Sequence, residues 1–162
     1  MIEFKQITFS NWNECIKLKV TEEQENYVAS NLYSLAEAYV AINSGDSPIL
    51  YAIYADGVMV GFLMYVYING EPEATDYQLN DHYFMLRLLI DKNHQGKGYG
   101  KQAVSKMVEE IKALPLRTTD RIYTSIEPTN IAAEKAYSSV GFMLTGEVVD
   151  NEAVMFLDIS EG

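Results

Sequence analysis

The sequence predicts one α/β domain, with mixed α+β character, in which helices flank a central sheet. Segments rich in β-branched and aromatic residues alternate with amphipathic segments, and turn residues separate them. A glycine-rich turn follows one apolar strand and opens a long amphipathic helix, as a crossover between parallel strands does. A chain of 162 residues that is 48% hydrophobic can bury one sizeable core. We therefore expect a single domain over residues 1–162.

The first part of the chain predicts a strand and two helices. Residues 2–8 begin with alternating apolar and polar side chains, which is typical of a strand. Asn11 and Glu14 have the spacing of a capping box, so we expect a helix there. Ser34 and Glu37 repeat this spacing ahead of a second helix. The apolar face expected on the second helix consists of Leu35, Tyr39 and Ile42.

A hairpin and an acidic loop are predicted next. Residues 49–54 and 58–68 are rich in β-branched and aromatic side chains, and Asp56-Gly57 between them is a strong turn signal, so the two strands should pair antiparallel. Residues 69–81 show little periodicity and form a loop whose length favours a binding role. Four acids lie in this loop, namely Glu71, Glu73, Asp76 and Asp81.

The remaining elements alternate between strand and helix. Residues 83–90 predict a strand, and the helix after the glycine turn ends before Pro115. Its predicted apolar face consists of Ala103, Val104, Met107, Val108 and Ile111. The last elements are a strand at 122–126, a helix at 130–139, and a strand pair at 142–148 and 154–157 joined through Asp150-Asn151.

Composition narrows the classes of partner. The formal net charge of −11 argues against nucleic acid, whose phosphates would be repelled, and favours a small cationic partner. Cys15 is the only cysteine, which excludes an intramolecular disulfide and a multi-thiolate metal site, and we expect no metal. The N-terminus lacks the pattern of a signal peptide and no apolar run is long enough for a membrane span, so we expect a cytoplasmic protein without a membrane partner.

The glycine-rich turn is the strongest signal of function. It reads Gln95-Gly96-Lys97-Gly98-Tyr99-Gly100. Glycines let the backbone approach a ligand closely, and the first N–H groups of a helix carry the positive end of its dipole. The turn therefore predicts a binding site for phosphate groups. Basic side chains gather around it at Lys92, Lys97, Lys101 and Lys106.

Two common phosphate-binding motifs fit this turn poorly. A Walker A loop is excluded, because Gln102 follows the Gly-Lys pair and Gln95 stands where the first glycine belongs. Gly98, Gly100 and Ala103 match the Rossmann pattern, but too few residues follow for the rest of a doubly wound domain. An NAD-binding module therefore remains only as an alternative.

Two motifs in sequence order resemble the GNAT superfamily of N-acetyltransferases. The spacing Gln95-x-x-Gly98-x-Gly100 is similar to its acetyl-CoA pyrophosphate loop. Its downstream signature resembles Asn130-x-x-Ala133-x-x-x-Tyr137-x-x-x-Gly141-Phe142. The resemblance implies a mixed, mostly antiparallel sheet of about seven strands with about four helices, in which the parallel fourth and fifth strands, joined by a crossover helix, splay apart.

Further segments resemble one branch of this superfamily, the bacterial spermine/spermidine acetyltransferases. With them the resemblance runs nearly from end to end. They are Glu23-Gln24, Tyr27-Val28-Ala29-x-Asn31, Ser34-Leu35-Ala36-Glu37-Ala38-Tyr39 and Val60-Gly61-Phe62-x-Met64-Tyr65.

The resemblance implies acetyl-CoA as cosubstrate and assigns its contacts. Main-chain N–H groups of residues 95–100 and the nearby Lys101 would bind the pyrophosphate, and the side chain of Gln95 would order the loop. Backbone of the fourth strand at Leu88, Leu89 and Ile90 would pair with pantetheine, as an added strand would. An N–H group of Leu89 or Ile90 would hold the acetyl carbonyl, and Asn130 would bond the pantetheine arm.

Acetyl transfer to an amine also needs an acid and a base. Tyr137 lies two helical turns after Asn130, so both reach one ligand, and by resemblance Tyr137 protonates the departing thiolate. Ser125 stands where some branches carry a basic glutamate, and serine cannot do that work. Glu127 is the substitute, on the same strand face if the strand extends so far; a loop carboxylate is the alternative role. Glu73 or Asp76 acting through water, and His82, are further candidates at the acceptor site, whereas His94 fits a loop role.

The sequence thus predicts acetyl transfer from acetyl-CoA to a primary amine, with a polyamine such as spermine or spermidine as acceptor, by direct attack in a ternary complex. A protein, peptide or other small-amine acetyltransferase is one alternative. A non-catalytic acyl-CoA sensor is another. Superfamily members are often dimers, so the resemblance also implies a homodimer.

Overall fold

The computed structural model describes residues 1–70, 80–115, 117 and 119–161. Its strands are β1 (Ile2–Lys5), β2 (Ile49–Ala55), β3 (Val58–Ile68), β4 (His82–Ile90), β5 (Arg121–Ile126), β6 (Met143–Val149) and β7 (Glu152–Asp158). Its helices are α1 (Trp12–Lys17), α2 (Asn31–Asn43), α3 (Tyr99–Lys112) and α4 (Ile131–Val140), with short 3-10 turns η1 (Glu22–Gln24) and η3 (Lys92–His94). This order confirms the predicted α/β architecture.

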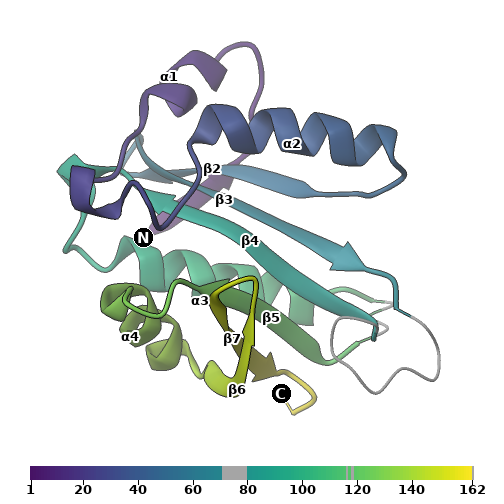
Figure 1. Ribbon diagram of the computed structural model, residues 1–162. Coiled ribbons are helices and arrows are strands. Elements are labelled where there is room, and N and C mark those ends of the chain that lie inside the picture. Colours follow the sequence, from purple (N-terminus) through teal and green to yellow (C-terminus); the bar gives the residue numbers. More distant parts are fainter. Residues whose placement is uncertain (71–79, 116, 118, 162) are drawn as a thin grey trace.

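The seven strands form one sheet in the order β1-β2-β3-β4-β5-β7-β6. All neighbours are antiparallel except β4 and β5, which run parallel and are joined by α3. Figure 1 shows α1 and α2 on one face of the sheet, and α3 and α4 on the other. The two hairpin turns lie where the sequence predicts them, since Asp56, Asp150 and Asn151 adopt positive φ angles of 49°, 50° and 66°.

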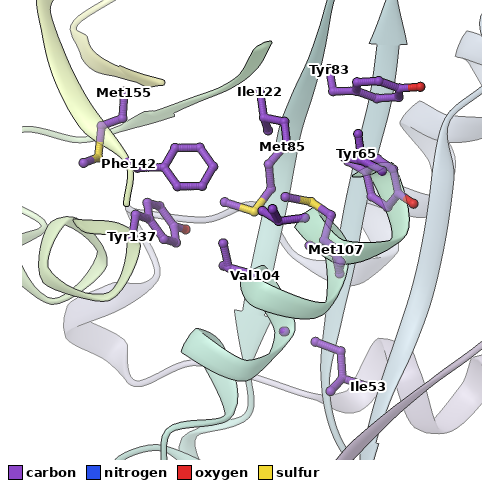
Figure 2. Close-up of a cluster of buried hydrophobic side chains, with 14 of the residues drawn as sticks. Ile53, Tyr65, Tyr83, Met85, Val104, Met107, Ile122, Tyr137, Phe142 and Met155 are labelled. Atoms are coloured by element: carbon purple, nitrogen blue, oxygen red, sulfur yellow. The ribbon is translucent and has the colours of Figure 1, made fainter. Parts of the chain in front are cut away.

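Two apolar clusters hold the layers together. The larger one fills the space between the sheet and the pair α3 and α4, and all five residues predicted for the apolar face of α3 are buried in it. Figure 2 shows part of this cluster, with Tyr137 beside Phe142 at one end. The smaller cluster lies under α1 and α2 and includes Cys15, which is fully buried as a small hydrophobe.

Both predicted capping boxes are wrong. Asn11 precedes α1, but its side-chain Oδ1 accepts a hydrogen bond from the N–H of Thr8 at 2.8 Å, outside the helix. α2 begins one turn earlier than predicted, because Ser30 is its N-cap and accepts from the N–H of Tyr33 at 3.1 Å. Ser34 therefore lies buried inside the helix.

The predicted apolar face of α2 is also wrong in part. Tyr39 and Ile42 are 72% and 59% exposed, whereas Asn31, Ser34 and Ala38 are buried. Apolar residues occur on several sides of this helix, so their spacing does not identify the packed face.

Candidate active site

The cleft begins where β4 and β5 part. Their parallel ladder pairs Tyr83 with Ile122, Phe84 with Tyr123, and Met85 with Thr124. Beyond Met85 the last residues of β4 and β5 line a cavity of about 1010 Å³ instead of pairing. The glycine turn, the first turn of α3, one side of α4 and the segment between η1 and α2 complete its walls. The predicted splay of the fourth and fifth strands is thus confirmed.

The glycine turn and the start of α3 form one wall of this cavity. Gly98 is the N-cap of α3 in the left-handed conformation, with φ 81° and ψ 10°, which a side chain would disfavour. The first intrahelical bond runs from the N–H of Gln102 to the carbonyl of Gly98 at 3.1 Å. The N–H groups before it have no intrahelical partner, and they lie at the positive end of a helix of 14 residues. This is the geometry that binds an anion.

Gln95 ties the turn to two other elements. Its side-chain amide nitrogen donates to the carbonyl of Ile90 at 3.0 Å and to Oε1 of Gln24 at 2.8 Å. The first bond fixes the turn to the end of β4, and the second fixes it to η1. The side chain therefore orders the loop instead of reaching into solvent.

Asp91 makes a second link at the same place. Its carboxylate accepts from the N–H groups of Lys19 at 3.0 Å and Asn93 at 3.1 Å, and it lies 3.3 Å from the ring of His94. Burial raises the pKa of this carboxyl, but the two backbone donors and His94 outweigh burial and leave the pKa below its usual value. Asp91 is therefore a structural anion beneath the turn.

Most residues predicted to bind the cofactor line this one cavity. They are Leu88, Ile90, Gln95, Gly96, Gly98, Tyr99, Gly100, Lys101, Asn130 and Tyr137. Leu89 and Lys97 are not among the lining residues. The side chain of Leu89 is buried in the smaller cluster on the other face of the sheet.

Asn130 and Tyr137 reach the cavity from α4. Asn130 is the N-cap of this helix, and its Oδ1 accepts from the N–H of Ala133 at 3.2 Å, which leaves its amide N–H groups for another partner. Tyr137 is 8% exposed, with its ring centroid 6.2 Å from that of Phe142. Burial raises the pKa of Tyr137 to about 12, so the phenol is protonated at neutral pH.

Glu127 lies just outside the cleft. β5 ends at Ile126, so Glu127 does not continue the face of the strand, and it is not among the residues that line the cavity. Its carboxylate accepts from the N–H of Thr129 at 2.8 Å and from the hydroxyl of the same residue. The hydroxyl oxygen of Thr129 also lies 3.1 Å from that of Tyr27. Glu127 thus has the geometry of the loop carboxylate that the sequence left open.

Of the residues predicted for the acceptor and its acidic loop, the structure describes His82 and Asp81. His82 is 3% exposed, lies 2.6 Å from the carbonyl of Asn80 through Nδ1, and is not among the lining residues. Burial lowers the pKa of His82. Asp81 accepts from the hydroxyl of Tyr67 and the N–H of Gly70, and so fixes the end of the loop. Glu71, Glu73 and Asp76 lie outside the described residues.

Two charged side chains in the cavity escape prediction from the sequence. Glu152, the first residue of β7, accepts a hydrogen bond from the hydroxyl of Ser125 at 2.5 Å. Arg87 on β4 lies 3.3 Å from the carboxylate of Glu37 on α2. Glu152 follows a predictable turn, but only the register of β5 against β7 reveals its neighbour. No spacing in the sequence marks the second pair.

The described residues contain neither a candidate metal centre nor a helix that could span a membrane. In that part, no three or more histidine, cysteine, aspartate or glutamate side chains are grouped so that they could hold a metal ion. Among the same residues, no helix has the length and apolar character that crossing a membrane requires.

Known proteins resemble this chain in sequence and in fold. Two curated relatives, each 31% identical over 159 residues and matched over 98% of this chain and 99% of their own, are a probable spermine N(1)-acetyltransferase from Bacillus subtilis subsp. natto (strain BEST195) and a spermine/spermidine N(1)-acetyltransferase from Bacillus subtilis (strain 168). Among solved structures, an aminoglycoside acetyltransferase, AAC(6')-Ib, in complex with coenzyme A aligns with a TM-score of 0.74 at 19% identity, over 98% of this chain and 95% of that one. A spermidine N-acetyltransferase from Vibrio cholerae, in complex with CoA and spermine, aligns with a TM-score of 0.71 at 17% identity, over 98% and 96%.

A family model gives the same assignment independently. The model of the acetyltransferase (GNAT) family matches residues 10–142, which include the glycine turn, Asn130 and Tyr137. Because this match spans most of the chain and the curated relatives are N-acetyltransferases over their whole length, the protein is an acetyltransferase that belongs to the GNAT family.

Proposed function

We propose that this enzyme transfers an acetyl group from acetyl-CoA to a primary amine of a small polycation, most simply spermine or spermidine. The observation that carries this proposal is the 31% identity to a spermine/spermidine N(1)-acetyltransferase over 98% of this chain. The net charge of −11 supports it, because an acidic protein attracts a polycation over long range.

The cofactor is proposed to lie along the parted strands. Main-chain N–H groups of residues 95–100, with Lys101 nearby, would bind the pyrophosphate at the start of α3, and the backbone of Leu88 to Ile90 would pair with pantetheine. Asn130 would donate its amide N–H groups to the same arm. This arrangement delivers the thioester to the point where β4 and β5 separate.

Tyr137 is proposed as the general acid. The amine nitrogen attacks the thioester carbonyl carbon, the carbon–sulfur bond breaks, and the thiolate takes the phenolic proton of Tyr137. A phenol whose pKa lies near 12 stays protonated before the thiolate forms, so it is available as a donor at neutral pH. An N–H group of Leu89 or Ile90 would stabilise the oxyanion.

The acceptor is proposed to enter from the side of the segment between η1 and α2. The lining residues there include Glu25 and Tyr27, and Glu152 faces them from β7. Glu73, Asp76 and His82 stay predictions as acceptor contacts. A homodimer and a cytoplasmic location likewise stay predictions.

The test is a panel of amines assayed by release of CoA. The panel contains spermine, spermidine, a monoamine of matched length, an aminoglycoside and a peptide with a free N-terminus. We expect kcat/KM to be highest for the polyamines. Activity on the peptide alone would replace the proposed substrate class, and binding of CoA without turnover of any amine would establish a sensor instead.

A further inference from the structure

The carboxylate of Glu152 lies in the cavity, and it has no chemical role in the steps proposed so far. It lies at the start of β7, immediately after the tight turn at Asp150-Asn151. Ser125 is paired with Val154 in the register of β5 against β7, and Glu152 is two residues before Val154 on the same face. The two side chains are therefore diagonal neighbours, which explains the hydrogen bond of 2.5 Å from Oγ of Ser125 to Oε2 of Glu152.

The face of the sheet decides what this carboxylate can reach. Ile122 and Ile126 on β5, and Met155 on β7, point into the core beneath α3 and α4. Ser125 and Glu152 alternate with them and so lie on the opposite face, toward the segment that precedes α2. Tyr137 enters the same cavity from α4, so a carboxylate and a phenol reach it from opposite faces of the sheet.

Building on the proposed function, we propose that Glu152 is the general base and that Ser125 is its positioning residue. An amine enters as an ammonium ion and gives one proton to the carboxylate of Glu152. The neutral nitrogen then forms a bond to the thioester carbonyl carbon, the carbon–sulfur bond breaks, and the sulfur takes a proton from Tyr137. The nitrogen then loses a second proton, which returns to the phenolate oxygen of Tyr137. The proton held by Glu152 leaves to solvent. Atoms and charge balance without another reactant.

Other groups face the same space and bear on its pH dependence. The titratable and charged side chains that line the cavity with Glu152 are Glu25, Tyr27, Arg87, His94, Tyr99, Lys101 and Tyr137. Of these, Arg87 is paired with Glu37, and His94 lies against Asp91. Glu127 is engaged with Thr129 outside the cavity, and Asp150 lies in the adjoining turn. Glu152 is thus a carboxylate of the cavity that strand pairing holds beside Ser125, at the end of β5 that has separated from β4.

The experiment compares Glu152→Gln with wild type across pH. We expect kcat/KM for spermidine to fall about 10²–10⁴-fold, with acetyl-CoA affinity and melting temperature unchanged. Residual activity of the variant should climb about tenfold per pH unit as the free amine grows, whereas wild type levels off near neutral pH. Glu147→Gln, an exposed glutamate on the neighbouring strand β6, is the matched control and should behave as wild type.

Two further variants separate catalysis from structure. Ser125→Ala removes the donor to the carboxylate, so the acid limb of kcat/KM should move to higher pH. The double variant Ser125→Glu with Glu152→Gln puts a carboxylate back beside the same point and should recover part of the activity that Glu152→Gln loses.

Two results would overturn this assignment and leave the proposed function standing. In one, wild type is active and Glu152→Gln has the same kcat/KM. In the other, only Glu127→Gln loses activity. A wild type that acetylates no amine would overturn both.

Discussion

The two ends of the cleft are built in different ways. At the proposed cofactor end, the part expected to bind phosphate is one continuous stretch, from Ile90 to the first turn of α3, and it offers main-chain groups. The proposed acceptor end is assembled from side chains far apart in the chain. Its contacts join Tyr27 to Thr129, Arg87 to Glu37, and Ser125 to Glu152. Main-chain recognition needs glycines at fixed spacing and so leaves a pattern in the sequence, whereas recognition by side chains from several elements does not.

The largest expected effect tests the cofactor end. Gly98→Val should abolish measurable acetyl-CoA binding, because a β-branched residue resists the left-handed conformation and its side chain would occupy the pyrophosphate site. Titration calorimetry with CoA measures this. Gly45→Val is the control, since Gly45 also has a positive φ and open space around it, but lies outside the cleft. If both variants fail to fold to the same extent, or if Gly98→Val binds CoA as wild type does, the glycine turn is a structural turn that does not bind the cofactor.

The next effect lies where the two ends meet. Tyr137→Phe should lower kcat about 10²–10⁴-fold, because the thiolate loses its proton donor, and should change acetyl-CoA affinity much less. Steady-state kinetics with spermidine measure it. Tyr65→Phe removes another buried phenol hydroxyl, one that lies 3.5 Å from Glu110, and serves as control. A kcat within a few-fold of wild type would point to a different donor.

A smaller effect is expected at the acceptor end. Tyr27→Phe should raise KM for the amine several-fold and leave acetyl-CoA affinity unchanged, because its contact with Thr129 joins the segment before α2 to the loop after β5. Thr129→Val should do the same, and the two changes together should not add. Tyr33→Phe on the exposed side of α2 is the control. If Tyr27→Phe weakens acetyl-CoA binding as much as it raises KM for the amine, the two ends of the cleft do not act separately.

The smallest effect concerns stability beneath the turn. The pKa of Asp91 is lowered on folding, so its bonds stabilise the protein at neutral pH, and this contribution disappears as pH falls through the folded pKa. Asp91→Asn should therefore lower the melting temperature at pH 7, by about 2–4 °C for each kcal/mol lost. The difference from wild type should begin to shrink below about pH 4, where the unfolded carboxyl takes up its proton, and should be lost only below the lowered pKa of the folded Asp91. Asp46→Asn, at an exposed site, is the control; a difference that persists unchanged in acid would contradict the assignment.

The same contrast explains what the sequence can predict. The order of strands and helices, the parallel β4 and β5, and the buried face of α3 follow from periodicity, turns and two motifs. The start of α2 does not, because Ser30 and Ser34 are both suitable caps; in the structure Ser30 caps the helix and Ser34 is buried within it. Whether Glu127 continues the face of β5 also depends on where the strand ends, and it ends at Ile126. Glu152 goes unnoticed because its neighbour is fixed by strand register.

The parting of β4 from β5 leaves a sheet edge inside the molecule. An edge strand normally invites another chain to add to it, with the risk of aggregation. Here the edge faces a cavity walled by β5, α4 and the segment before α2, so the unpaired end of β4 lies inside the fold and not at the outer border of the sheet. Proteins commonly protect such edges by covering them with other elements, and these three elements cover this one. The same cover that makes the cavity thus also shields a sheet edge from other chains.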